Sequence, residues 1–217
     1  ELERRLRSRG RETEDEITLR LQKAATESEY MELFDYLIIN DLEPLKNTSI
    51  TELELLGTRV LSNDYSVLKD MNSIYRLYLS DPESGMLDTL GEITTITDLS
   101  VEAWPYENLE SISTLINIST ISISSSKLNN LSGIEGMQNL ANMYMNGCVR
   151  LADVSGIEKL PHLQYFVCNS TVIEDITPIC NLPQSVSTVI LSDEIAKRVL
   201  EEVPDFADNR MGMEEYR

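Results

Sequence analysis

The chain has 217 residues, 41% hydrophobic and 25% charged, a composition that excludes wholesale disorder and suffices for a sizeable core. Its 37 acidic and 18 basic residues give a formal charge of −19, a field that repels nucleic acid and anionic lipid. Because the longest apolar runs span only a few residues, the sequence predicts no membrane span and no signal peptide.

Residues 1–45 open with helix signals and end with a strand signal. A basic segment closes at Gly10, and Thr13 with Glu16 predicts a capping box at the start of a second helix. The run Phe34-Asp-Tyr-Leu-Ile-Ile-Asn40 predicts a strand that could pair beside Leu53 and Leu55.

This segment resembles the lid and last core strand of guanylate kinases. The resemblance is carried by Leu-Glu-Arg-Arg-Leu-Arg-Ser-Arg-Gly-Arg-Glu-Thr-Glu-Asp-Glu-Ile and Glu-Leu-Phe-Asp-Tyr-Leu-Ile-Ile-Asn-Asp, from Glu1 to about Glu43. It implies that Arg5, Arg9 and Arg20 are lid arginines that contact ATP phosphates, and that Asn40 lies against the adenine.

The phosphate-binding loop of that family, Gly-x-x-x-x-Gly-Lys-[Ser/Thr], does not occur in these 217 residues. Arginines without an aligned substrate have nothing to stabilise, so we expect no phosphoryl transfer by the chain alone. The competing interpretation of the arginines is a solvated amphipathic helix surface.

Residues 50–192 contain seven copies of the pattern apolar-x-x-apolar-x-apolar. The copies recur every 22 to 24 residues, and several are followed by a second apolar series such as Leu128, Leu131 and Ile134. The middle apolar positions are 53, 77, 99, 121, 143, 166 and 189.

This periodicity resembles the leucine-rich repeats of the internalin-like 22-residue class, over about residues 45–192. The resemblance implies an α/β solenoid with a parallel β-sheet on the concave face and 3₁₀ or irregular segments on the convex side. The turn position three residues after each strand predicts Ser126, Cys148 and Thr171 as the residues that could form a ladder of side-chain hydrogen bonds.

Alternation along the strands sends every second side chain out of the sheet. Exposed tyrosine beside asparagine is typical of an adaptable protein-binding face, although β-propensity alone could also place these residues there. We expect the partner-binding face to comprise Tyr78, Asn142, Tyr144, Asn146, Tyr165, Val167, Asn169 and Ile190.

The expected organisation has three parts: residues 1–45 as a kinase-like N-terminal cap, 46–192 as the solenoid, and 193–217 as a C-terminal cap. In the last part Ser192 predicts a helix N-cap, the helix runs toward Pro204, and residues 205–217 are expected to fray. Both ends of a solenoid need polar caps.

The single histidine, His162, and three cysteines with no Cys-x-x-Cys pair predict no metal site, no cofactor and no disulfide framework. His162 reads as a surface turn residue, Cys168 as a small core side chain, Cys148 as a turn residue and Cys180 as a partly exposed thiol. A nucleophilic cysteine paired with His162 is the weaker alternative. Unpaired cysteines favour a reducing, cytoplasmic compartment.

The sequence therefore favours a module that uses its concave face to bind a protein or peptide, and we expect that partner to have a basic rim. Nucleic acid and membrane are not expected as partners. The alternative is the C-terminal part of a guanylate kinase that carries the repeats as an appended docking domain. The sequence does not predict the oligomeric state.

Overall fold

The computed structural model describes residues 7, 13–19, 21, 37–39, 41–56, 58–60, 65–82, 84–170, 172–208 and 210–213. The chain divides into two compact units, Glu1–Ile38 and Ile39–Arg217, which are treated separately. The predicted lid arginines Arg5, Arg9 and Arg20, as well as Asn40 and Thr171, lie outside the described residues.

In the first unit, residues 14–19 are helical and the predicted capping box is present. The backbone N–H of Thr13 donates to Glu16 Oε2 at 2.8 Å, and the N–H of Glu16 donates to Thr13 Oγ1 at 3.3 Å. These reciprocal bonds satisfy two backbone donors at the helix start. Arg7 forms an ion pair with Glu14, and Ile17 is buried.

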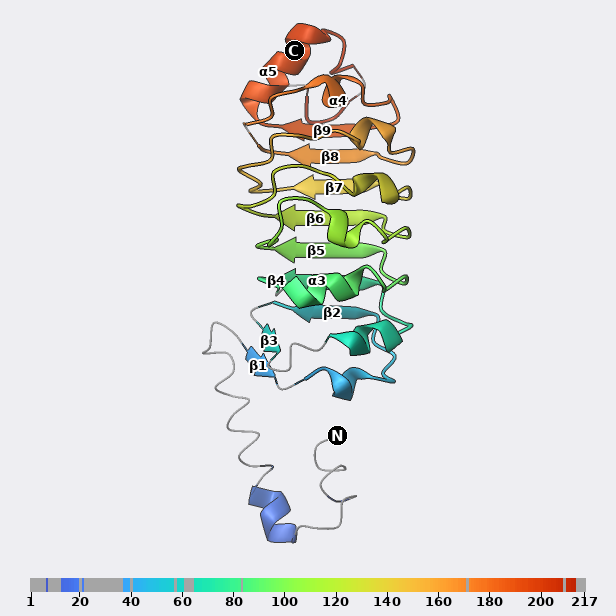
Figure 1. Ribbon diagram of the computed structural model, residues 1–217, viewed down its shortest axis with the longest axis vertical. Coiled ribbons are helices and arrows are strands. Elements are labelled where there is room, and N and C mark those ends of the chain that lie inside the picture. Colours follow the sequence, from blue (N-terminus) through green and yellow to red (C-terminus); the bar gives the residue numbers. More distant parts are fainter. Residues whose placement is uncertain are drawn as a thin grey trace. The chain divides into compact units, whose positions relative to one another are not determined.

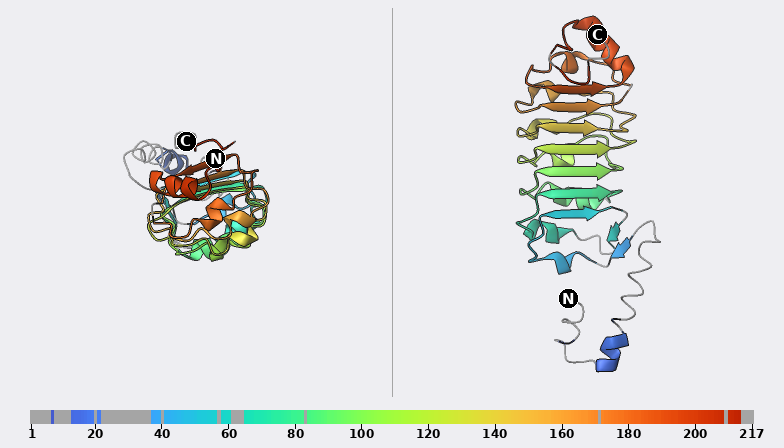
Figure 2. Two further views of the ribbon diagram at one scale, coloured as in Figure 1. Left: turned by 90° about the horizontal axis from the view of Figure 1, so that it is seen from above. Right: turned by 180° about the vertical axis from the view of Figure 1, so that it is seen from behind.

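The second unit is built on a seven-stranded parallel sheet in the order β2-β4-β5-β6-β7-β8-β9 (Figure 1). Figure 2 shows the same strands from behind, with the short helices on their far side. The strands are β2 (Glu52–Leu55), β4 (Arg76–Ser80), β5 (Asp98–Glu102), β6 (Thr120–Ser124), β7 (Asn142–Met145), β8 (Tyr165–Cys168) and β9 (Thr188–Leu191).

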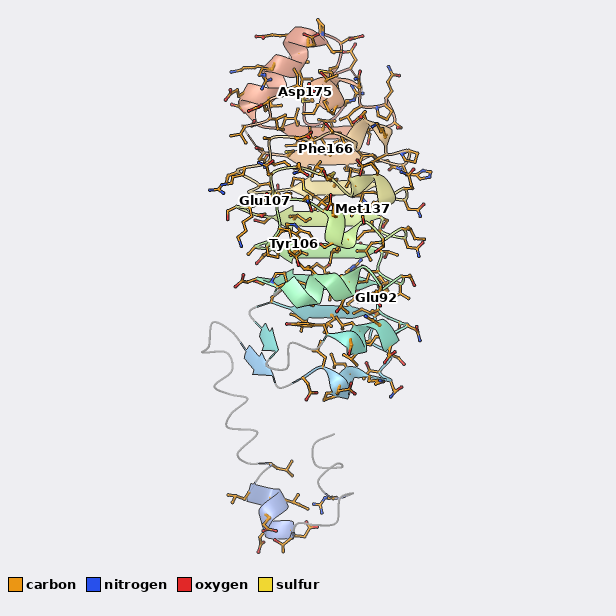
Figure 3. The ribbon with its side chains drawn as sticks, viewed as in Figure 1. Glu92, Tyr106, Glu107, Met137, Phe166 and Asp175 are labelled. Atoms are coloured by element: carbon orange, nitrogen blue, oxygen red, sulfur yellow. The ribbon has the colours of Figure 1, made fainter. Side chains whose placement is uncertain are left out.

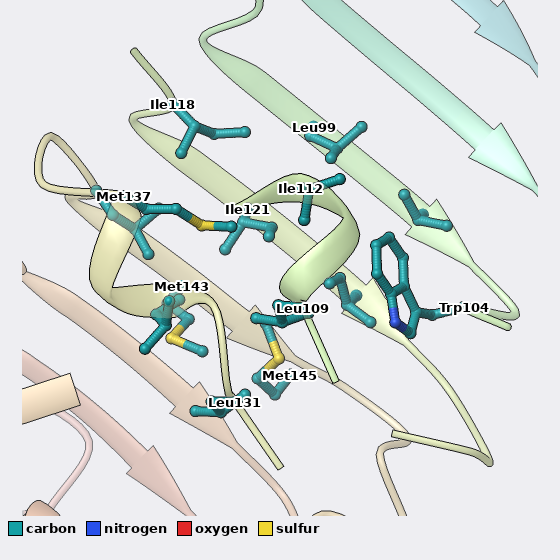
Figure 4. Close-up of a cluster of buried hydrophobic side chains, with 14 of the residues drawn as sticks. Leu99, Trp104, Leu109, Ile112, Ile118, Ile121, Leu131, Met137, Met143 and Met145 are labelled. Carbon is teal, nitrogen blue, oxygen red and sulfur yellow. The ribbon is translucent and has the colours of Figure 1, made fainter. Parts of the chain in front are cut away.

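The strand register confirms the predicted repeat. The middle apolar residues pair in one continuous row: Leu53, Leu77, Leu99, Ile121, Met143, Phe166 and Val189. Parallel strands bring equal repeat positions side by side, so each row stacks apolar side chains on apolar side chains. The inward rows are buried along the sheet and pack against the return segments (Figure 4).

The return segments are mostly 3₁₀, as expected for so short a path. They are η1 (Glu43–Leu45), η2 (Ser66–Asp70), η3 (Glu110–Ile112), η4 (Ile134–Gly136) and η5 (Ile157–Lys159). Two return segments are α-helical instead: α3 (Ser84–Leu90), between η2 and η3, and α4 (Thr177–Cys180), after η5.

Several return segments open with one local motif, in which an Asn or Asp side chain accepts the backbone N–H two residues later. A buried or partly buried apolar residue follows the Asn or Asp directly, and another comes three residues after that. The accepting residues are Asp41, Asn108, Asn130, Asp153 and Asp175. Asp41 to Leu45 therefore already has the local structure of a repeat.

Of the three predicted turn residues, Cys148 is confirmed: it is buried, and its thiol donates to Ile123 O in the previous repeat. The turns after β6 and β8 instead use the residue one position earlier. Ser126 is exposed, whereas Ser125 is buried, donates to Trp104 O at 2.8 Å and accepts the backbone N–H groups of Lys127 and Leu128. Ser170 is likewise buried and donates to Leu151 O. The inward-turned residue must reach both its own turn and the previous repeat, and after β6 and β8 the residue nearer to the strand meets both demands.

The kinase-like strand does not begin the solenoid sheet, contrary to expectation. β1 (Leu37–Ile39) belongs with β3 (Thr58–Val60) to a separate two-stranded sheet, while β2 pairs with β4. The spacing of 16 residues between Leu37 and Leu53 is shorter than one repeat and cannot complete the return path.

At the C-terminal end, α5 (Asp193–Glu202) buries Ile195, Ala196 and Val199. The helix starts where predicted, yet the hydroxyl of Ser192 donates to Ser170 O rather than capping the helix.

The segment after α5 is packed rather than frayed over residues 205–208 and 210–213. Phe206, Ala207 and Met213 are buried in the core. The guanidinium of Arg210 lies 4.0 Å from the ring centroid of Phe206 and donates to the carbonyl oxygens of residues 182, 183, 186 and 206. Met211 exchanges backbone hydrogen bonds with β9, accepting from Val189 N and donating to Ser187 O.

Candidate functional site

The candidate site is the side of the seven-stranded sheet that faces away from the core, here called the outer face. Side chains alternate along each strand, so three outward rows cross the sheet. The outer face comprises Glu52, Glu54, Leu56, Arg76, Tyr78, Ser80, Asp98, Ser100, Glu102, Thr120, Ser122, Ser124, Asn142, Tyr144, Asn146, Tyr165, Val167, Asn169, Thr188, Ile190 and Ser192.

The part of the outer face over β2, β4 and β5 is acidic. Arg76 donates to Glu52 Oε1 at 3.0 Å and its Nε lies 4.0 Å from Asp98 Oδ1. The carboxylate of Glu52, followed by Tyr78, raises the pKa of the Arg76 guanidinium. The Tyr75 hydroxyl also donates to Glu52 Oε1.

Two more carboxylates of this half, Glu54 and Glu102, are exposed. Among the described residues neither has an ion pair or hydrogen bond. Four carboxylates thus face one guanidinium over these three strands, and two of the carboxylates are available to an incoming cation.

A neutral strip separates this acidic half from the rest of the outer face. β6 contributes Thr120, Ser122 and Ser124, all half-buried. Its hydroxyls are short and uncharged, so they add neither charge nor large apolar area.

The part over β7, β8 and β9 is aromatic and aliphatic with amide borders. Tyr165 and Ile190 are each 40% exposed, and Tyr144 is half-buried beside Val167 in the register. Val167 points outward as predicted but is only 9% exposed, because Tyr144 and Ile190 flank it on the neighbouring strands. It forms the floor of an apolar patch rather than a free contact residue.

The asparagines of this half are held by neighbouring side chains. Asn142 Nδ2 donates to Thr120 Oγ1 at 3.1 Å, and Asn169 Nδ2 donates to Asn146 Oδ1 at 3.4 Å. Asn146 and Asn169 remain exposed beside the apolar patch. Tyr78, in contrast, lies over β4 in the acidic half and is separated from the other predicted contact residues.

Sequence reasoning missed two exposed valines at the turns that follow β7 and β8. Val149 and Val172 are both largely exposed and stand at the same place in successive repeats. Their spacing of 23 residues was a signal that could have identified them.

The remaining chemistry-bearing residues are dispersed. His162 is exposed in a turn, as predicted, and no cluster of three or more His, Cys, Asp or Glu side chains is positioned to hold a metal within the described parts of the chain. Cys148 and Cys168 are buried, and burial raises the pKa of each thiol to about 11, which disfavours a nucleophilic thiolate. Figure 3 shows the side chains of the repeats, with Phe166 and Asp175 labelled.

In the portion that the structure describes, every helix is too short or too polar to cross a bilayer.

No protein-family model matches the chain. A guanylate kinase from Desulfitobacterium hafniense is 49% identical over 45 residues, which are 21% of this chain and 22% of that protein. The chain therefore spans about a fifth of the length of the curated relative that it matches.

Two solved internalins from Listeria monocytogenes resemble the structure. Internalin C2 aligns with a TM-score of 0.56 and 25% identity, covering 73% of this chain and 68% of the other. Internalin InlF aligns with a TM-score of 0.32 and 15% identity, covering 79% and 69%. Together with the seven parallel strands, the likeness to internalin C2 makes the fold an α/β leucine-rich repeat solenoid.

Proposed function

We propose that this chain is a protein-interaction module that binds a protein or peptide on its outer face. The observation that carries the proposal is the exposure of Tyr165 and Ile190 over the buried floor of Val167. Apolar side chains that form a patch bordered by amides are typical of a protein interface. The binding face in this proposal comprises Tyr78 over β4 and, over β7 to β9, Asn142, Tyr144, Asn146, Tyr165, Asn169 and Ile190, with Val167 as the floor of the apolar patch.

The partner class follows from charge. A net charge of −19 and an acidic half of the outer face favour a partner with a basic rim over nucleic acid or anionic membrane. Three free cysteines support a reducing, cytoplasmic setting.

The proposal assigns residues 1–45 as a kinase-like N-terminal cap, 46–192 as the binding solenoid, and 193–217 as the C-terminal cap. Support for the last assignment comes from the burial of Ile195, Ala196 and Val199 by α5. Deletion of residues 1–45 should cause self-association, because it exposes the apolar edge around Leu53 and Leu55 and an uncovered edge strand pairs with other chains. A truncated chain that stays monomeric with an unchanged thermal midpoint would remove the N-terminal assignment.

The test of binding is capture of partners by wild type and by a Tyr144→Ala/Tyr165→Ala variant. The matched control is Ile116→Ala/His162→Ala, which changes two exposed residues away from the outer face. We expect the outer-face variant to lose partners that wild type and control retain. Identical partner sets for all three proteins, each with the same circular dichroism spectrum, would exclude this face.

A second function is supported by the 49% identity to a guanylate kinase: the C-terminal part of such a kinase with the repeats as a docking domain. We expect no conversion of GMP to GDP by these 217 residues, because they contain no phosphate-binding loop. ATP-dependent GDP formation that is lost in Arg9→Ala would show that the chain alone is a kinase.

A further inference from the structure

The chemistry of the outer face changes across the strands rather than along them. Acidic side chains lie over β2 to β5, hydroxyls over β6, and apolar side chains over β7 to β9. Each strand has only four or five residues, so a ligand that ran along one strand would meet a single chemistry. A ligand that contacts both halves must cross the strands.

The width of the face suits an extended chain. Three outward rows, each ~7 Å from the next, span ~13 Å along the strand direction. That width accommodates one extended peptide with its side chains. The backbone groups of β4 to β9 are engaged in the parallel ladder, so recognition must use side chains of the outer face.

The distances between the two halves of the outer face determine how many residues of the ligand separate its apolar anchor from its basic side chains. β8, which carries Tyr165 and Val167, is separated from β5 by three strand steps and from β2 by five. At ~4.8 Å per step these are ~14 Å and ~24 Å, and an extended chain covers them in about four and about seven residues.

We propose that the outer face binds an extended peptide that crosses the strands, with an aromatic or aliphatic anchor over β8 and a Lys or Arg about four and about six or eight residues away, even spacings that keep all three side chains on the side of the peptide that faces the sheet. The first basic side chain meets Glu102 on β5, and the second meets Glu54 on β2, the two exposed carboxylates without a partner among the described residues. The inference rests on the proposed function and adds the chemistry and spacing of the ligand.

Strand β4, which lies between β2 and β5, supports the proposed spacing of the two basic residues. β4 carries Arg76, which is already paired with Glu52 and repels a cation placed between the two sites. The neutral hydroxyls of β6 separate the anchor from the first basic residue and favour small polar residues there.

The test is selection of a displayed library of random linear 12-residue peptides on the full chain, followed by affinity measurement of the enriched sequences. We expect enriched peptides to place Lys or Arg three to five and six to eight residues from an aromatic or aliphatic residue, in one chain direction. Isomers of the same composition with adjacent basic residues should bind at least tenfold more weakly.

Variants of the protein locate the contacts. Glu54→Gln/Glu102→Gln should abolish the difference between the spaced and compacted isomers, whereas Glu194→Gln/Glu201→Gln, with the same charge change on α5, should preserve it. Two results would overturn the inference: equal affinity of wild type for the peptides with spaced and with adjacent basic residues, or selected peptides in which the spacing of basic residues from the anchor is random. Outer-face-dependent capture of a protein partner under those outcomes would leave the proposed function standing.

Discussion

The two faces of the sheet differ in how constant their composition is from repeat to repeat. The inward rows hold Leu, Ile, Met, Phe, Val and Cys in all seven strands and are buried in every repeat, whereas the outward rows change from acidic to hydroxylic to apolar along the solenoid. A uniform inner face follows from packing, since each repeat must present the same shape to the next. The non-uniform outer face is free of that demand, and for this reason we base the function on it.

The largest expected change in stability comes from a substitution on the inner face. Phe166→Ala should lower the free energy of unfolding by about 3 to 5 kcal/mol, because it leaves a cavity among fully buried neighbours. Urea unfolding followed by circular dichroism measures this loss. A change below about 1 kcal/mol would mean that Phe166 does not lie in the core.

A smaller effect distinguishes two adjacent serines at one turn. Ser125→Ala should cost about 1 to 3 kcal/mol, since it leaves the N–H groups of Lys127 and Leu128 without their acceptor. Ser126→Ala, at the exposed neighbour, should change stability by less than about 0.5 kcal/mol. Thermal unfolding gives the midpoint of each variant. Equal midpoints for Ser125→Ala and Ser126→Ala would contradict the assignment of Ser125 as the buried turn residue.

The buried thiols should make stability depend on alkaline pH. Burial raises the pKa of Cys148 and of Cys168 from 9.0 to about 11, so above about pH 9 the unfolded chain loses thiol protons that the folded chain retains. The unfolded state then binds fewer protons, and stability falls as pH rises between about 9 and 11.

Urea midpoints at several pH values should therefore fall less steeply in Cys148→Ala/Cys168→Ala than in wild type. Cys180→Ala serves as the comparison and should reduce the slope less, because burial raises the pKa of that partly buried thiol as well, but it is one thiol rather than two. Parallel slopes in wild type and the double variant would contradict the burial of both thiols.

The smallest effect is expected on the outer face. Tyr165→Ala should change the free energy of unfolding by less than about 1 kcal/mol, because 40% of the residue is exposed and its neighbours are Asn142 and Thr188. A loss as large as that of Phe166→Ala would show that the two faces are assigned one residue out of register.

The strand register could be predicted because Leu53, Leu77 and Leu99 begin a row that repeats along the whole solenoid. The ladder residue was predicted one position too late at Ser126, since strand-end turns vary in length between repeats and no periodic signal fixes them. The packing of Phe206 and Arg210 could not be predicted, because a terminal segment occurs once and has no period.

On the outer face, too, only part of the structure could be predicted from the sequence. The sequence indicated which residues point outward but not how far their neighbours cover them, so Val167 was expected to be exposed. Coverage depends on how the side chains of the adjacent strands, here Tyr144 and Ile190, pack over their neighbour, and the repeat period does not determine this packing.

The segment that ends at Met211 has a consequence for assembly. A parallel sheet that simply stopped at β9 would offer its backbone to the first strand of another molecule and could grow end to end into a fibre. Met211 instead takes the hydrogen bonds of Val189 and Ser187, and Arg210 ties the carbonyls of the last turn to the same segment. Arg210 and Met211 thus close the β9 edge of a sheet whose repetition would otherwise permit polymerisation.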